Sequence, residues 1–137
     1  MADSIISNSE SETVAIGTQF SQQLKQGDVV ALSGEMGAGK TYFVKGIAEG
    51  LGFAGEVTSP TFTLLHEYRG GRLSLWHADW YRIQSQREIN FLGLDDALHE
   101  GVLVMEWPEK IETLSLTPAF HVKIEIQNET QRKISWE

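Results

Sequence analysis

The sequence predicts an α/β fold in which a central, mostly parallel sheet is extended by antiparallel hairpin strands. Two segments, 9–27 and 41–52, carry apolar residues at helical spacing, and between them residues 28–33 form a short apolar run typical of a buried strand. Residues 62–68 and 73–79 are strand-like and are joined around Gly70-Gly71, which favours a hairpin. Strands are also predicted at 102–107, 120–127 and 132–136, the last two as a terminal hairpin.

The first helix is expected to begin at a capping box, because Ser9 and Glu12 stand in Ser-x-x-Glu order. Apolar residues then recur at roughly helical spacing, at Val14, Ile16, Phe20 and Leu24, and Gly27 ends the run. The second helical stripe consists of Phe43, Val44, Ile47, Ala48 and Leu51 and is closed by Gly52. Residues 88–100 are expected to be helical in parts, with an interruption at Gly93.

Length and composition favour a single domain over residues 1–137 and exclude several classes of protein. The absence of cysteine excludes disulfides and thiolate metal sites. Residues 1–6 have neither the basic region nor the apolar core of a signal peptide. No apolar run approaches the ~18 residues of a membrane helix, so we expect a cytoplasmic protein that does not associate with a membrane. A net charge of −8 disfavours direct binding to a nucleic-acid backbone.

The segment from Gly34 to Thr41, Gly-Glu-Met-Gly-Ala-Gly-Lys-Thr, fits the phosphate-loop pattern G-x-x-x-x-G-K-[ST] at every fixed position. Glycines let successive backbone N–H groups turn towards phosphate oxygens at a helix N-terminus. A Gly-rich turn alone could fit the pattern, but here a predicted buried strand precedes it and an amphipathic helix follows it. The residues predicted to bind the phosphates of ATP are Met36, Gly37, Ala38, Gly39, Lys40 and Thr41. We therefore expect a three-layer sandwich of the P-loop NTPase type.

Two acidic residues are candidates for the chemistry beside this loop. Glu106 ends the apolar run 102–105, where a Mg²⁺-anchoring acid would lie, although most P-loop proteins carry the shorter Asp there. Asp79 ends another strand-like run and is predicted to be catalytic, as are Lys40 and Glu106. Thr41 and Glu106 are the predicted Mg²⁺ ligands. His77 faces the same side as Asp79 and is expected to orient its neighbour rather than to act in catalysis.

The loop at Thr58-Ser59-Pro60-Thr61 could sense the γ-phosphate as a switch, or it could be an ordinary turn, and local sequence leaves both readings open.

Taken together, these motifs resemble the TsaE (YjeE) family over nearly the whole chain. The similar segments are Glu12-Thr13, Gly34–Thr41, Ser59–Phe62, His77–Arg82 and Glu106–Glu109. Each segment alone is weak evidence for the family, but the whole set in this order and at these separations is specific for it. The departures are Trp80 and Met36, where Leu is usual, and Tyr42, where a smaller residue is frequent; none of the three alters a predicted phosphate or metal ligand.

The resemblance implies an ATPase that acts with the TsaB and TsaD proteins when threonylcarbamoyl is placed on adenosine 37 of tRNA. TsaE-like proteins bind the TsaB–TsaD pair, and ATP hydrolysis to ADP is thought to reset that pair. By this resemblance tRNA is reached only through the partners, Thr41 and Glu106 hold Mg²⁺, and Asp79 is the catalytic acid. Thr13 and Arg132 are implied to contact the nucleotide on its base side.

Two other functions remain open from the sequence. A small-molecule P-loop kinase would need an acceptor site and an arginine-bearing lid, for which only Arg82 and Arg87 fall in a suitable region. A nucleotide-binding interaction module with negligible turnover would use the same residues as a slow ATPase. A GTPase is disfavoured because neither Asp-x-x-Gly nor [NT]-Lys-x-Asp occurs.

Overall fold

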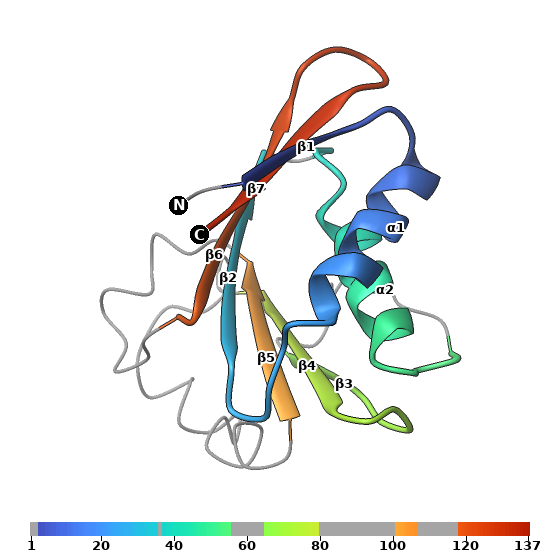
Figure 1. Cartoon of the computed structure of the whole chain (residues 1–137), viewed down its shortest axis with the longest axis vertical. Helices are drawn as coiled ribbons and strands as arrows, with labels where there is room; N and C mark the ends of the chain where they lie inside the picture. The colour runs from blue at the N-terminus through green and yellow to red at the C-terminus, as the bar shows by residue number, and fades with distance from the viewer. Residues whose placement is uncertain (1–2, 36, 56–64, 80–100, 107–117) are drawn as a thin grey trace.

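The computed structural model describes residues 3–35, 37–55, 65–79, 101–106 and 118–137 (Figure 1). Several predictions fall outside these ranges: the possible switch loop at 58–61, the partial helix at 88–100, and the phosphate-loop residue Met36. Of the segments that carry the resemblance, residues 80–82 and 107–109 are likewise not described.

The described strands form one seven-stranded sheet in the order β1-β7-β6-β2-β5-β4-β3. Their bounds are β1 Asp3–Ser7, β2 Val29–Gly34, β3 Leu65–Tyr68, β4 Ser74–Asp79, β5 Gly101–Glu106, β6 Phe120–Ile126 and β7 Arg132–Trp136. The four central strands β6, β2, β5 and β4 are mutually parallel, whereas β3, β7 and β1 pair antiparallel at the two sides. This confirms the predicted α/β fold with a mostly parallel centre and antiparallel hairpins.

The two described helices, α1 (Glu10–Ser21) and α2 (Lys40–Gly50), cover the same face of the sheet (Figure 1). Ser9 caps α1 as predicted, because its side chain accepts a hydrogen bond of 3.1 Å from the Glu12 N–H. The Glu12 carboxylate reaches back to the backbone N–H of Asn8 rather than to that of Ser9. The helix stops at Ser21, well before Gly27, and the N–H groups of the next three residues, 22–24, bond carbonyls three residues back in tighter turns.

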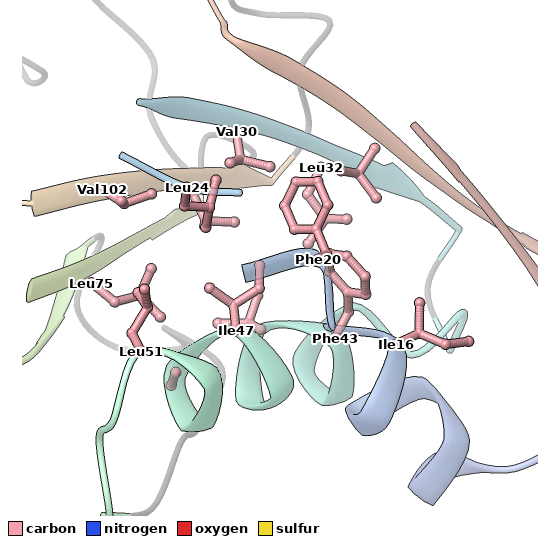
Figure 2. Packing of buried hydrophobic residues seen from close by; sticks show 14 of the residues in the cluster. Ile16, Phe20, Leu24, Val30, Leu32, Phe43, Ile47, Leu51, Leu75 and Val102 are labelled. Atoms are coloured by element: carbon pink, nitrogen blue, oxygen red, sulfur yellow. The ribbon is translucent and has the colours of Figure 1, made fainter. Parts of the chain in front are cut away.

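The core lies between this helical layer and the sheet (Figure 2). Phe20 of α1 is fully buried, and its ring centroid lies 5.2–5.5 Å from those of Phe43, Phe120 and Trp136. The predicted stripe of α2 is buried along its whole length, and each of its larger side chains, from valine upwards, contributes roughly 1.5–3 kcal/mol on burial. Both helices are therefore held firmly over the central strands.

The opposite face of the central strands is also apolar. Its residues Val29, Ala31, Ala78, Leu103 and Met105 are all buried. A continuous apolar run, rather than an alternating one, is what parallel strands buried on both faces require. Of the three layers expected, the described part of the chain supplies the sheet and one helical layer.

Helices α1 and α2 approach each other closely because glycine lies at their crossing. A Cβ on Gly46 would lie 2.0 Å from the carbonyl oxygen of Val14 and 2.9 Å from the Cα of Gly17. The Thr18 hydroxyl also lies 3.0 Å from the carbonyl oxygen of Gly46, to which it donates. This close contact sets the position of α2, and hence of the loop that precedes it, relative to α1.

Strand β1 was not among the elements predicted from the sequence. It pairs antiparallel with β7, with Asp3 opposite Trp136 and Ser7 opposite Arg132. Its partner lies at the far end of the chain, so local patterning gives little sign of it. No helix among the described residues has the length and apolar character needed to span a membrane.

Candidate nucleotide-binding site

The phosphate loop connects the end of β2 with the start of α2, as the sequence predicted. Gly37 and Gly39 adopt φ angles of +84° and +99°, in the left-handed region that glycine occupies without strain. At Gly34 the requirement is space, because a Cβ would lie 2.9 Å from the carbonyl oxygen of Ile124 on β6. The backbone N–H of Ala38 bonds the Glu35 carbonyl at 3.0 Å, which closes the turn.

The N-terminus of α2 favours an anion. Its N-cap residue is Gly39, no side chain caps it, and its first turn carries no acidic residue. The first N–H groups of a helix have no partner within the helix, and the helix dipole places partial positive charge at this end. Lys40 and Thr41, the first two residues of α2, therefore lie where a phosphate would be bound.

Two acidic positions meet beside this loop, at the carboxyl ends of neighbouring strands. Glu106 is the last residue of β5 and pairs in register with Asp79, the last residue of β4, and with Leu32 of β2. Ligands of open α/β sheets bind at this edge. The backbone thus brings together the two acids predicted from the sequence, and the side chain of Asp79 lies outside the described part of the structure.

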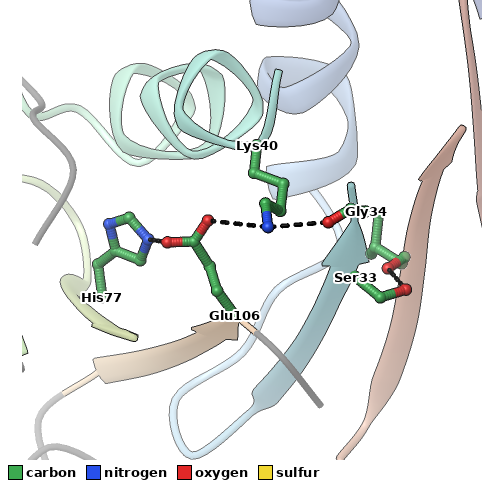
Figure 3. A network of polar contacts seen from close by, with 6 residues as sticks. Ser33, Gly34, Lys40, His77 and Glu106 are labelled. Carbon is green, nitrogen blue, oxygen red and sulfur yellow. Dashed lines mark hydrogen bonds and ion pairs between the residues drawn. The ribbon is translucent and has the colours of Figure 1, made fainter. Parts of the chain in front are cut away.

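Lys40, Glu106 and His77 form a buried polar network (Figure 3). The Lys40 ammonium donates to the Gly34 carbonyl at 2.9 Å and lies 4.0 Å from Glu106 Oε1. The other carboxylate oxygen, Oε2, lies 2.9 Å from His77 Nε2. Lys40 and Glu106 are only 9% and 5% exposed, so their opposite charges offset much of each other's cost of burial.

A cavity of about 260 Å³ adjoins the phosphate loop on the side of α1. It is lined by Asn8, Ser9, Glu10, Thr13, Gly37, Ala38, Gly39, Tyr42, Glu129, Thr130 and Arg132. The structure thereby places the two predicted base-side residues, Thr13 and Arg132, in the same cavity as Gly37–Gly39. Because the phosphate loop forms one wall of this cavity, a nucleotide whose phosphates lie on the loop has space beside it for its nucleoside part.

The polar groups of these two residues already have protein partners. The Thr13 hydroxyl is buried and lies 2.8 Å from Ser7 Oγ and 3.2 Å from the Ser9 carbonyl oxygen. The Arg132 guanidinium donates to the carbonyl of Gly37 at 3.2 Å and to two carbonyls of the β6–β7 turn. Arg132 thus ties the turn to the phosphate loop, and the base-side role of both residues stays a prediction.

Two further residues of this cavity are Tyr42, which the sequence analysis noted only as a departure from the family pattern, and Glu10, which it did not consider. They stand at the first turns of α2 and α1, and the Tyr42 hydroxyl bonds the Glu10 carboxylate. This hydrogen bond, followed by the negative charge of Glu10, raises the pKa of Tyr42 above its ordinary value of 10.0. The signal in the sequence was an aromatic residue directly after the loop, where a smaller one is frequent in the family; in the structure Tyr42 is 37% exposed.

The donor set beside the loop fits Mg²⁺. Thr41 and Glu106 offer hydroxyl and carboxylate oxygens, the hard ligands that this ion prefers. Within the described ranges no three His, Cys, Asp or Glu side chains group closely enough to hold a metal ion by themselves. Mg²⁺ bound by one or two protein ligands together with nucleotide phosphates and water needs no such cage.

Comparison with known proteins supports one family. The family model described as threonylcarbamoyl adenosine biosynthesis protein TsaE matches residues 7–134. Proteins named tRNA threonylcarbamoyladenosine biosynthesis protein TsaE are similar: that of Bacillus subtilis is 42% identical over 91% of this chain and 78% of its own, and that of Treponema pallidum is 43% identical over 89% of each. The crystal structure of Bacillus subtilis YdiB superposes with a TM-score of 0.78 at 36% identity, covering 99% of this chain and 84% of that one. The chain therefore belongs to the TsaE family, as its motifs indicated.

Proposed function

We propose that this protein binds and hydrolyses ATP with Mg²⁺ in the cytoplasm, and that this ATP cycle supports threonylcarbamoyl modification of adenosine 37 in tRNA, together with TsaB and TsaD. The observation that carries the ATP part is the placement of Lys40 and Glu106 together beside a glycine loop that opens α2. The pathway part rests on membership of the TsaE family and on the names of its relatives.

Each residue has a distinct task in this proposal. The backbone N–H groups from Gly37 to Thr41 surround the phosphates, and Lys40 exchanges the Gly34 carbonyl for phosphate oxygens. Thr41 and Glu106 would hold Mg²⁺, which offsets phosphate charge when it is bound. Asp79 lies at the same sheet edge and would orient the attacking water.

The arrangement favours slow turnover by the isolated chain. In P-loop NTPases an arginine directed at the γ-phosphate contributes about 10³–10⁵ in rate. Arg132 is the described arginine that contacts the phosphate loop, and it is engaged by the carbonyls of Gly37, Asn128 and Gln131. We therefore expect the TsaB–TsaD pair to raise the rate of hydrolysis or the affinity for ATP.

Phosphate release should be measured in four reactions: the chain alone, with tRNA, with TsaB–TsaD, and with both. Stimulation is expected from TsaB–TsaD and not from tRNA alone, because a protein with net charge −8 repels a polyanion. Lys40→Ala run in parallel measures any contaminating ATPase. Strong stimulation by tRNA alone would refute a partner-mediated function. Tight ATP binding without phosphate release in any reaction would indicate an interaction module, and phosphate on a small-molecule acceptor would indicate a kinase.

A further inference from the structure

His77 is a fully buried polar residue at the edge of the proposed site. It lies on β4 opposite Val104 of β5, two pairs before the register match of Asp79 with Glu106. Its imidazole reaches diagonally to the neighbouring strand, where Nε2 lies 2.9 Å from Glu106 Oε2. The other ring nitrogen, Nδ1, is buried and has no hydrogen-bond partner among the residues that the structure describes.

These contacts define which nitrogen carries the hydrogen. A carboxylate only accepts hydrogen bonds, so Nε2 must be the donor to Glu106. A hydrogen on Nδ1 would be buried without an acceptor among the described residues, which is unfavourable. The contacts therefore favour the tautomer with hydrogen on Nε2, and the polar contact of the ring in the described structure is directed at Glu106 alone.

The donor restricts the orientation of the Glu106 side chain. Figure 3 shows the carboxylate between the imidazole and the ammonium, with Oε2 towards His77 and Oε1 towards Lys40. Glutamate is one methylene longer than the aspartate common at this position, so it has one more side-chain torsion to fix. With Oε2 occupied by His77, Oε1 is the oxygen presented to the phosphate loop.

We propose that His77 is a positioning residue that holds Glu106 so that a single oxygen, Oε1, is presented to the Mg²⁺ of the bound nucleotide. The inference rests on the proposed function, because the residue that His77 orients, Glu106, is a proposed Mg²⁺ ligand of the nucleotide site. Partners that orient a metal ligand commonly change metal affinity by about 10–100-fold when they are removed. His77 itself contacts neither metal nor nucleotide in this role.

Two substitutions separate positioning from packing. The amide nitrogen of His77→Gln can occupy the place of Nε2, whereas that of His77→Asn matches Nδ1 and cannot reach Glu106. Binding of a fluorescent ADP analogue is measured with EDTA and across a Mg²⁺ titration, and thermal unfolding reports folding. His121→Asn, which replaces an exposed histidine of β6, is the matched control.

We expect His77→Asn to raise by about 10–100-fold the Mg²⁺ concentration that gives half of its maximal effect on binding of the ADP analogue. The affinity for the analogue in EDTA should be unchanged. His77→Gln should restore most of the Mg²⁺ response, and His121→Asn should match the wild type. An unchanged Mg²⁺ response in folded His77→Asn would overturn the positioning role alone. Equal loss of affinity with and without Mg²⁺ in both His77 variants would overturn it in favour of packing. No nucleotide binding by the wild type would overturn the proposed function as well.

A second readout needs no nucleotide. Imidazole ¹⁵N shifts of the free protein should show His77 as the Nε2–H form, and Glu106→Ala should shift its Nε2 resonance while the His121 resonances stay in place. A His77 ring with hydrogen on Nδ1 would overturn the inference, whatever the protein does with ATP.

Discussion

Gly46→Ala tests whether the close crossing of α1 and α2 is required for the fold around the phosphate loop. The added Cβ would lie 2.0 Å from the Val14 carbonyl oxygen and 2.9 Å from the Gly17 Cα, both of which are backbone atoms. Neither can rotate away as a side chain would, so the two backbones must separate by about 1.4 Å to bring the 2.0 Å contact to the 3.4 Å of ordinary van der Waals contact. That separation would also stretch the hydrogen bond from Thr18 to Gly46.

The expected cost follows from two opposing terms. Adding atoms to a well-packed interior lowers the free energy of unfolding by about 1–3 kcal/mol. Because the atoms that meet the new Cβ belong to the backbone, we expect this term to lie at or above the upper end of that range. Alanine in place of glycine inside a helix returns at most about 1 kcal/mol. We therefore expect Gly46→Ala to lower the free energy of unfolding by about 1–3 kcal/mol, which corresponds to a fall in Tm of roughly 4–12 °C for a chain of this size.

Thermal unfolding followed by circular dichroism measures this shift. Lys45→Ala is the matched control, since Lys45 is the exposed neighbour on the same helix and its truncation should change stability by no more than about 0.5 kcal/mol. An unchanged or increased Tm for Gly46→Ala would show that the helices can part without cost, and the reasoning from close backbone contact would be refuted.

Two further predictions concern the proposed chemistry. Lys40→Ala should lower turnover by at least about 10²–10³-fold and greatly weaken ATP binding, because it removes the cation directed at the loop. Phosphate release measures the turnover, and an ATP titration measures the binding. Near-wild-type turnover would refute the phosphate-loop assignment. Glu106→Gln should weaken the Mg²⁺ dependence of nucleotide binding, whereas Asp79→Asn should preserve affinity and lower turnover. The reverse pattern in Mg²⁺ titrations would exchange the two roles, and equal loss of affinity would indicate that both acids form one metal site.

Local patterns in the sequence determined much of the fold and part of the site. The capping residue Ser9, the apolar stripe of α2 and the strand that ends at Glu106 each depend on neighbours a few residues away, so periodicity and turn chemistry were enough to predict them. The phosphate loop was predictable for the same reason, because its glycines and lysine act through backbone geometry contained within eight consecutive positions.

Only the tertiary structure decided which distant residues share the site. Strand β1 and the β6–β7 turn bring Asn8 and Thr130 to the same cavity as the phosphate loop, although they lie at opposite ends of the chain. The partner of His77 likewise emerged only in three dimensions: the sequence placed it beside Asp79 on one strand, whereas the structure directs its ring across the sheet to Glu106. Such contacts depend on strand order and register, which are fixed by burial of both faces of the sheet and not by spacing along one segment.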